Sequence, residues 1–258
     1  GMRTSLEPEE FFKAVNKTGL AVVGKPGNLA PADKKLYALR DVTATVDSIP
    51  LIAASIMSKK LAAGNDCILL DVKTGSGAFM KSLDDSAVLA EKMVAIGEHA
   101  GKRTVALITD MDIPLGYAIG NSLEVAEAVD TLLGKGPKDL TQVCISLAAN
   151  MLYLADMGTL DECTAMAEEA ITSRKAFHKL IEMVETQGGD SDVIKDTGMF
   201  KQAAYSQEVT AERSGYISHI NTEECGIASV ALGAGRETKE SEIDYAAGIV
   251  LLKKYRDY

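Results

Sequence analysis

The composition of the chain is that of a folded globular protein: of its 258 residues, 47% are hydrophobic and 25% are charged. This balance excludes collagen-like, intrinsically disordered and disulfide-scaffold proteins. The 27 Lys and Arg residues stand against 37 Asp and Glu residues, which gives a formal net charge of −10. Because an acidic chain repels a phosphate backbone, we expect no nucleic acid as a partner, although a small anion can still bind at a local basic cluster.

The spacing of apolar residues and the positions of Gly and Pro predict alternating helices and strands. A strand, a helix and a strand over residues 67–72, 84–100 and 104–109 predict one βαβ unit with parallel strands. The other predicted elements, in chain order, are a helix over 8–17, a buried strand over 20–23, helices over 31–39, 48–63 and 123–133, a run of helices over 139–186 with breaks near residues 158 and 173, β-prone segments over 209–220 and 225–232, and a final amphipathic helix over 243–254.

The cysteines and the apolar runs bear on the compartment. The four cysteines lie far apart and include no C-x-x-C pair, so we expect reduced, buried thiols in a cytoplasmic protein. The longest apolar runs, residues 49–57 and 67–72, fall short of the roughly 18 residues that a spanning helix needs, so we expect no membrane segment. No apolar stretch of a secretory signal follows Gly1 and Met2. The cysteines are Cys67, Cys144, Cys163 and Cys225.

Several common catalytic motifs are absent from the sequence. The loop Gly75-Ser76-Gly77 follows a predicted strand, but Met80 stands where a G-x-G-x-x-G fingerprint needs its third glycine. The chain has neither a complete Walker A motif nor a G-x-S-x-G elbow. Its histidines form no cluster with one another or with cysteine, so we expect no zinc site, and solvated helix positions explain His99 and His178.

The predicted helix over 48–63 carries a polar stripe among apolar neighbours. Ser55, Ser58 and Lys59 share one face of this helix, because they recur at helical spacing. Either the lysine complements the helix macrodipole while the serines bond back to preceding carbonyls, or the stripe faces a bound partner. Spacing alone favours the first interpretation. Arg40 is equally ambiguous, because a contact with Asp41 or with a helix dipole explains it without a ligand.

Two long stretches carry a far more specific pattern. The first is ADKKLYALRDVTATV at residues 32–46, continued at residues 48–52 and 55–60, and the second is LDVKTGSGAFM at residues 70–80. In this order they closely resemble pyrimidine-nucleoside phosphorylases and their thymidine phosphorylase relatives. The similarity continues through PLG at 114–116 and LGAG at 232–235, and essentially every part of the chain has a counterpart in that family.

The resemblance implies an α/β fold with a mixed, largely parallel sheet, flanking helices, an inserted helical segment and a partial C-terminal α+β domain. In the family, the packing partners of the helical segment lie in helices that this chain lacks. We therefore expect Ile49, Ile52 and Ile56 or their neighbours to expose apolar surface or to be covered by self-association, for which a homodimer is one arrangement. The implied domains are residues 1–31 with 63–200 for the α/β domain, 32–62 for the helical segment and 201–258 for the partial C-terminal domain.

The family catalyses reversible phosphorolysis, in which a pyrimidine nucleoside and phosphate give free base and pentose 1-phosphate. The resemblance implies that Arg40, Ser55 and Lys59 bind the base, and that Arg40 and Lys59 are catalytic. Tyr37 and Phe79 match positions that line the base pocket. This chemistry is consistent, because uracil and thymine present two carbonyl acceptors and one N–H donor. Cations against the base oxygens also stabilise the negative charge that develops as the glycosidic bond breaks.

The resemblance also implies a bound cation, with Leu115 and Ala118 as ligands through their carbonyls and Glu127 through its side chain. Such oxygen ligands suit a hard, weakly charged ion such as potassium, and no organic cofactor is expected. The remaining ligands come from a family segment that this chain lacks. Asp71 and Lys73, at the C-terminal end of a predicted strand, are either site residues or an internal ion pair, and the sequence leaves both possibilities open.

The segments that the chain lacks limit the activity that the resemblance implies. Family members carry a glycine-rich Lys-x-Ser-x-Gly-Gly loop that cradles phosphate, and no such motif occurs in these 258 residues. We therefore expect a truncated phosphorylase, inactive alone, whose small-molecule partners are a pyrimidine nucleoside or base and phosphate. The alternative is a non-catalytic homologue that acts as a binding or interaction protein. The sequence does not distinguish uridine from thymidine as the substrate.

Overall fold

The computed structural model describes residues 1–24, 30–40, 43, 45, 48–236, 238 and 240–254, without the side chains of residues 37, 38 and 40. Contacts within the chain divide it into two units. Unit 1 comprises Gly1–Gly24, Asp112–Gln142 and Glu168–Tyr258, and unit 2 comprises Lys25–Met111 and Val143–Ala167. The domain boundaries that the resemblance implies stay a prediction.

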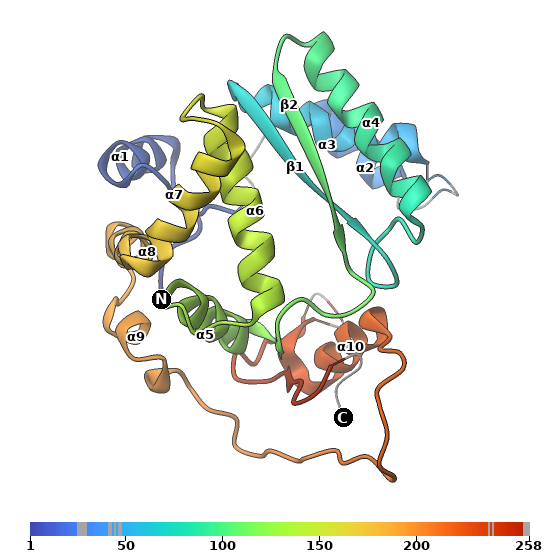
Figure 1. Cartoon of the computed structure of the whole chain (residues 1–258), viewed down its shortest axis with the longest axis vertical. Helices are drawn as coiled ribbons and strands as arrows, with labels where there is room; N and C mark the ends of the chain where they lie inside the picture. Colours follow the sequence, from blue (N-terminus) through green and yellow to red (C-terminus); the bar gives the residue numbers. More distant parts are fainter. Residues whose placement is uncertain are drawn as a thin grey trace. The chain divides into compact units, whose positions relative to one another are not determined.

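Three helices precede the first strand, the strands β1, β2 and β3 follow with α4 between the first two, and helices dominate the second half of the chain (Figure 1). The helices are α1 (Pro8–Thr18), α2 (Pro31–Arg40), α3 (Ile49–Ala62), α4 (Leu83–His99), α5 (Asn121–Leu132), α6 (Lys138–Leu154), α7 (Leu160–Thr172), α8 (Lys175–Thr186), α9 (Asp192–Lys195) and α10 (Thr222–Ser229). The strands are β1 (Cys67–Thr74), β2 (Arg103–Asp110), β3 (Ala118–Ile119) and β4 (Ile249–Val250).

Unit 2 is built on β1 and β2, which pair in parallel over their whole lengths. The nearly continuous apolar run of β1 is what a strand covered by helices requires. Ile68, Leu70 and Val72 are buried in one cluster with Met57 of α3 and Met93 of α4. Figure 1 shows α4 lying along the two strands that it connects, so the predicted βαβ unit is confirmed.

Unit 1 has its own core, formed by residues of α5, α8 and α9. A buried glutamine after α8, Gln187, ties the N-terminal segment to this unit. Its Nε2 donates to the carbonyls of Arg3 and Val22, both at 2.8 Å, and its Oε1 accepts from the Val22 N–H at 2.9 Å. Because side-chain bonds replace a neighbouring strand here, the strand predicted over 20–23 is wrong.

The helices predicted between residues 8 and 186 are present close to their expected bounds, and the α/β class is confirmed. Capping explains this accuracy for α4, because the Ser82 Oγ accepts the Asp85 N–H at 3.1 Å where the helix begins. The described parts of the chain form one parallel pair, β1 with β2, and one antiparallel pair, β3 with β4.

The predictions for the tail are wrong. Residues 209–220 form no strand, and Figure 1 shows the segment before α10 as an extended trace. The β-prone run 225–232 is helical instead, because the Asn221 Oδ1 accepts the Glu224 N–H at 3.3 Å and starts α10. The helix predicted over 243–254 is replaced by β4, since Gly248 brings the backbone against the Ile119 carbonyl, where a side chain would collide.

The apolar side of α3 is only partly covered. Ile49, Ile52 and Ile56 are partly buried and pack against the core of unit 2. Their neighbours Leu36, Leu39 and Leu51 expose apolar surface, which is one of the outcomes expected for this segment. All four cysteines are free thiols, but only Cys163 is buried, so the expectation of four buried thiols is wrong. No helix in the described residues is long and apolar enough to cross a membrane.

Candidate functional site

The polar stripe of α3 has a partner on α2. The ammonium Nζ of Lys59 donates to Asp33 Oδ2 at 2.8 Å and to Ser55 Oγ at 3.0 Å. The side chain of Lys59 is 41% exposed, while that of Asp33 is 13% exposed. The pairing with Asp33 gives Lys59 a specific partner, which the helix macrodipole alone does not explain. Ser58 follows the simpler interpretation, because its Oγ donates to the Ser55 carbonyl at 3.0 Å.

This arrangement leaves the lysine able to bind a ligand. An ammonium has three N–H donors, and the described contacts of Lys59 use two of them. The third donor and the exposed part of the side chain remain open to an acceptor oxygen. The Ser55 hydroxyl is buried and accepts from Lys59, so its own proton is directed elsewhere.

The remaining predicted base-site residues are placed only in part. Phe79 lies in the loop after β1 and is 75% exposed. The side chains of Tyr37 and Arg40 lie outside the described residues. The structure therefore brings Ser55 and Lys59 together, with Asp33 as a third member.

Asp71 and Lys73 form an internal ion pair. Lys73 Nζ lies 2.8 Å from Asp71 Oδ2 and donates to Thr109 Oγ1 at 2.9 Å. Thr109 in turn donates to Asp71 Oδ1 at 2.5 Å, which closes a ring of contacts across the paired strands β1 and β2. The sequence left open whether Asp71 and Lys73 are site residues or an internal ion pair, and the structure shows the ion pair.

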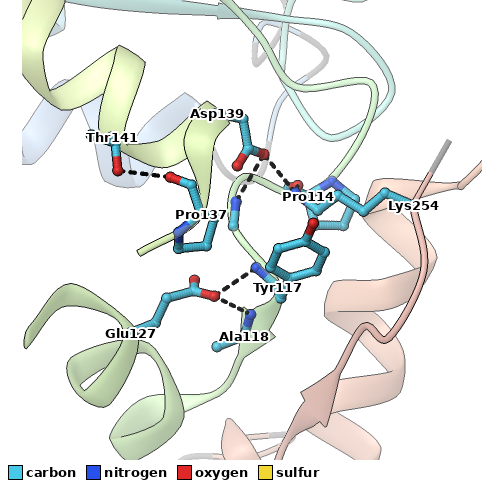
Figure 2. A network of polar contacts seen from close by, with 9 residues as sticks. Pro114, Tyr117, Ala118, Glu127, Pro137, Asp139, Thr141 and Lys254 are labelled. Atoms are coloured by element: carbon cyan, nitrogen blue, oxygen red, sulfur yellow. Dashed lines mark hydrogen bonds and ion pairs between the residues drawn. The ribbon is translucent and has the colours of Figure 1, made fainter. Parts of the chain in front are cut away.

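Two of the predicted cation ligands, Ala118 and Glu127, lie together in unit 1 (Figure 2), and Leu115 stands three residues before Ala118 in the loop that leads into β3. Glu127 of α5 faces this loop, and its Oε1 accepts the Tyr117 N–H at 2.8 Å and the Ala118 N–H at 3.2 Å. Gly116, with a φ of +71°, is required here because a Cβ would collide with the Glu127 carboxylate. The sequence pointed to Glu127, but it gave no signal that Gly116 would lie against this carboxylate.

The backbone direction places the Ala118 carbonyl on the same side as this carboxylate. The Tyr117 carbonyl accepts the Leu251 N–H at 2.8 Å, and Ala118 stands opposite Val250 in the antiparallel pair. Successive residues of a strand direct their N–H and C=O groups to opposite edges. Since the Ala118 N–H meets Glu127, its carbonyl lies at that edge as well, away from β4. A carboxylate and a carbonyl so placed fit a hard cation.

Comparison with known proteins identifies the family. The family model described as "Glycosyl transferase family, a/b domain" matches residues 1–177. The chain belongs to this glycosyltransferase family. The model for the pyrimidine nucleoside phosphorylase C-terminal domain matches residues 216–258. Pyrimidine-nucleoside phosphorylases of Bacillus subtilis (strain 168) and Staphylococcus aureus (strain USA300) are each 54% identical over 258 residues, which is 100% of this chain and 60% of either relative.

These matches confirm the resemblance drawn from the two long stretches. The chain spans about 60% of the length of the curated relatives that it matches. Asp33 is the residue that the sequence analysis of this family member missed. It lies in the same stretch as Tyr37 and Arg40, four and seven residues before them, so helical spacing was the signal that could have joined it to the site.

Proposed function

We propose that this chain forms the pyrimidine-binding part of a nucleoside phosphorylase site, for the reaction of pyrimidine nucleoside and phosphate to base and pentose 1-phosphate. The observation that carries the proposal is the contact of Lys59 with Ser55 and Asp33 on two adjoining helices. The 54% identity of the whole chain to proteins named pyrimidine-nucleoside phosphorylase supports it.

In this proposal Lys59 donates its third N–H to a carbonyl oxygen of the base. Asp33 and Ser55 hold the ammonium in one direction, so little reorganisation is needed when the base binds. As the glycosidic bond breaks, the base oxygen gains negative charge, and the contact with Lys59 becomes stronger than in the neutral substrate. Arg40 supplies a second cation by family resemblance, and the exposed ring of Phe79 supplies an apolar face for the base.

The cation site forms a second part of the proposal. Glu127, Ala118 and Leu115 would hold a potassium ion, which supplies positive charge and fixes the loop that it binds. Among the described residues no donor contacts the Oε2 of Glu127, so this oxygen can serve as the ligand atom. Glu127→Gln keeps an acceptor for the loop N–H groups and removes the charge. We expect it to abolish a potassium-specific rise in melting temperature, while Asp130→Asn in the same helix retains that rise.

We expect the 258-residue chain alone to release no uracil from uridine, since the sequence holds no Lys-x-Ser-x-Gly-Gly loop to cradle phosphate. Calorimetric titration with uracil therefore tests the proposal directly. Lys59→Met removes the donor and keeps the length of the side chain, and we expect binding at least about tenfold weaker, as for a lost charge-assisted hydrogen bond. Lys60→Met, at the exposed neighbour, is the matched control and should bind as the wild type does.

Equal binding by Lys59→Met and the wild type would reject Lys59 as a base ligand. Absence of uracil binding by the folded wild-type chain would reject the pyrimidine site itself and leave the non-catalytic alternative. Release of uracil in the presence of phosphate would instead overturn the expected inactivity.

A further inference from the structure

A buried lysine near the C-terminus, Lys254, contacts the loop that contains the predicted cation ligands Leu115 and Ala118. Lys254 is only 8% exposed. Its Nζ lies 2.6 Å from Asp139 Oδ2 at the start of α6 and donates to the Pro114 carbonyl at 2.9 Å. The same Nζ lies 4.8 Å from the centre of the Tyr117 ring, within range of a cation–π contact. Figure 2 shows the side chains of Lys254 and Asp139 next to Pro114 and Tyr117 of the loop.

The loop is therefore held from two sides. Glu127 accepts the N–H groups of Tyr117 and Ala118, while Asp139 Oδ2 accepts the N–H of Gly116 at 3.2 Å. Two donors contact carbonyls of the loop: Lys254 Nζ donates to the Pro114 carbonyl, and the Leu251 N–H donates to the Tyr117 carbonyl. These contacts hold peptide groups on both sides of Leu115 and immediately before Ala118.

Within residues 114–118 the contacts leave three carbonyls without a described donor, those of Leu115, Gly116 and Ala118, and two of these three are the predicted cation ligands. Leu115 lies between Pro114, held by Lys254, and Gly116, held by Asp139. Ala118 follows Tyr117, whose carbonyl is held by Leu251. A ligand carbonyl flanked by fixed peptide groups has little freedom to turn away, and such supporting contacts commonly tune the affinity of a metal site.

We propose that Lys254 is a positioning residue that joins Asp139 to the loop and so sets the direction of the Leu115 and Ala118 carbonyls toward the cation. The inference rests on the cation site of the proposed function. It is independent of the base site, which lies in the other unit. It also gives the last described residues of the chain a role in that site, although they are 115 positions from Asp139 and 140 from Pro114.

The test uses the full chain and two measurements. Lys254→Met keeps the side-chain length and most of the packing but removes the donors. Hydrogen exchange followed by mass spectrometry measures how often residues 113–120 open. Thermal melting in KCl, compared with choline chloride at the same ionic strength, gives the potassium concentration at which half of the rise in melting temperature is reached. Lys201→Met, which removes a lysine from an exposed ion pair with Asp244 in the same unit, is the matched control.

We expect Lys254→Met to speed exchange in residues 113–120 but not in β1 or α4, and to weaken potassium binding about tenfold. Lys201→Met should change neither quantity. A merely structural role would lower the melting temperature without moving the potassium midpoint. Unchanged exchange of residues 113–120 in Lys254→Met would overturn the proposal.

Two further variants cover a failure of Lys254→Met to fold. Asp139→Asn should speed hydrogen exchange in residues 113–120. Lys254→Arg should retain part of the potassium affinity because it keeps the positive charge. If both variants matched the wild type in exchange and in the potassium midpoint, the inference would be wrong. A wild-type chain without any potassium-specific shift would reject the cation site, whereas the exchange data would still decide whether Lys254 holds the loop.

Discussion

The two candidate sites are assembled in opposite ways. The contact of Lys59, Ser55 and Asp33 joins adjoining helices that lie within one stretch of the sequence, and the largest separation is 26 residues. The cation loop instead combines residues 114–118 with Glu127, Asp139 and Lys254, up to 140 positions apart. The first site therefore depends on local helix geometry and on the packing beneath it, and the second depends on long-range contacts of the tail.

The largest effect is expected where α3 rests on the core of unit 2. Met57 is fully buried in the core of unit 2 and stands two residues from both Ser55 and Lys59, so it lies on the other side of α3 from them. Met57→Ala should lower the free energy of unfolding by about 2–5 kcal/mol, since it removes buried methylene groups and leaves a cavity. Urea unfolding measures the change, and Leu51→Ala, at an exposed position of the same helix, is the control and should cost far less.

A result in which the two variants destabilise the chain equally would contradict the packing of α3 that the base site depends on. A loss of uracil binding by Met57→Ala in conditions where the chain remains folded would in turn show that the core sets the geometry of Lys59.

An intermediate effect is expected at the close approach of β3 and β4. A Cβ on Gly248 would collide with the carbonyl of Ile119 and lie within 2.8 Å of Leu123 Cδ1. Gly248→Ala should therefore cost about 1–3 kcal/mol, as overpacking does, and should open residues 117–119 to hydrogen exchange. Gly226→Ala is the control, because a Cβ there meets no heavy atom within 4 Å. Equal exchange of residues 117–119 in both variants would show that the tail does not fix the loop.

The same contrast explains how much could be predicted from the sequence. The helix α4 could be predicted because apolar residues recur at helical spacing, and the structure adds the Ser82 cap at its start. Lys59 and Ser55 could be paired for the same reason. The strand β4 could not be predicted, since it depends on β3 about 130 positions earlier and on a glycine that admits its backbone. Lys254 was assigned to a helix, and its contacts with Asp139 and Pro114 have no local signal.

The smallest expected effect is a pH dependence of the Lys254 contact. Burial raises the pKa of Asp139, but the hydrogen bond from Lys254 and the N–H groups of Leu140 and Gly116 outweigh it, so the pKa lies below its ordinary value. The folded state therefore binds fewer protons than the unfolded chain near pH 4, and the carboxylate stabilises the fold above the ordinary Asp pKa of about 3.9. That contribution is lost as the pH falls from this value through the lower folded pKa.

Melting of the wild type and of Asp139→Asn between pH 7 and pH 3 checks this sign, because asparagine keeps the shape and does not titrate. The difference in melting temperature should be constant above about pH 5 and should shrink below about pH 4. Since the Asp139 side chain is partly exposed, salt should reduce the difference as well. A difference that grew on acidification would mean that Asp139 is protonated more easily in the fold, which the 2.6 Å contact with Lys254 opposes.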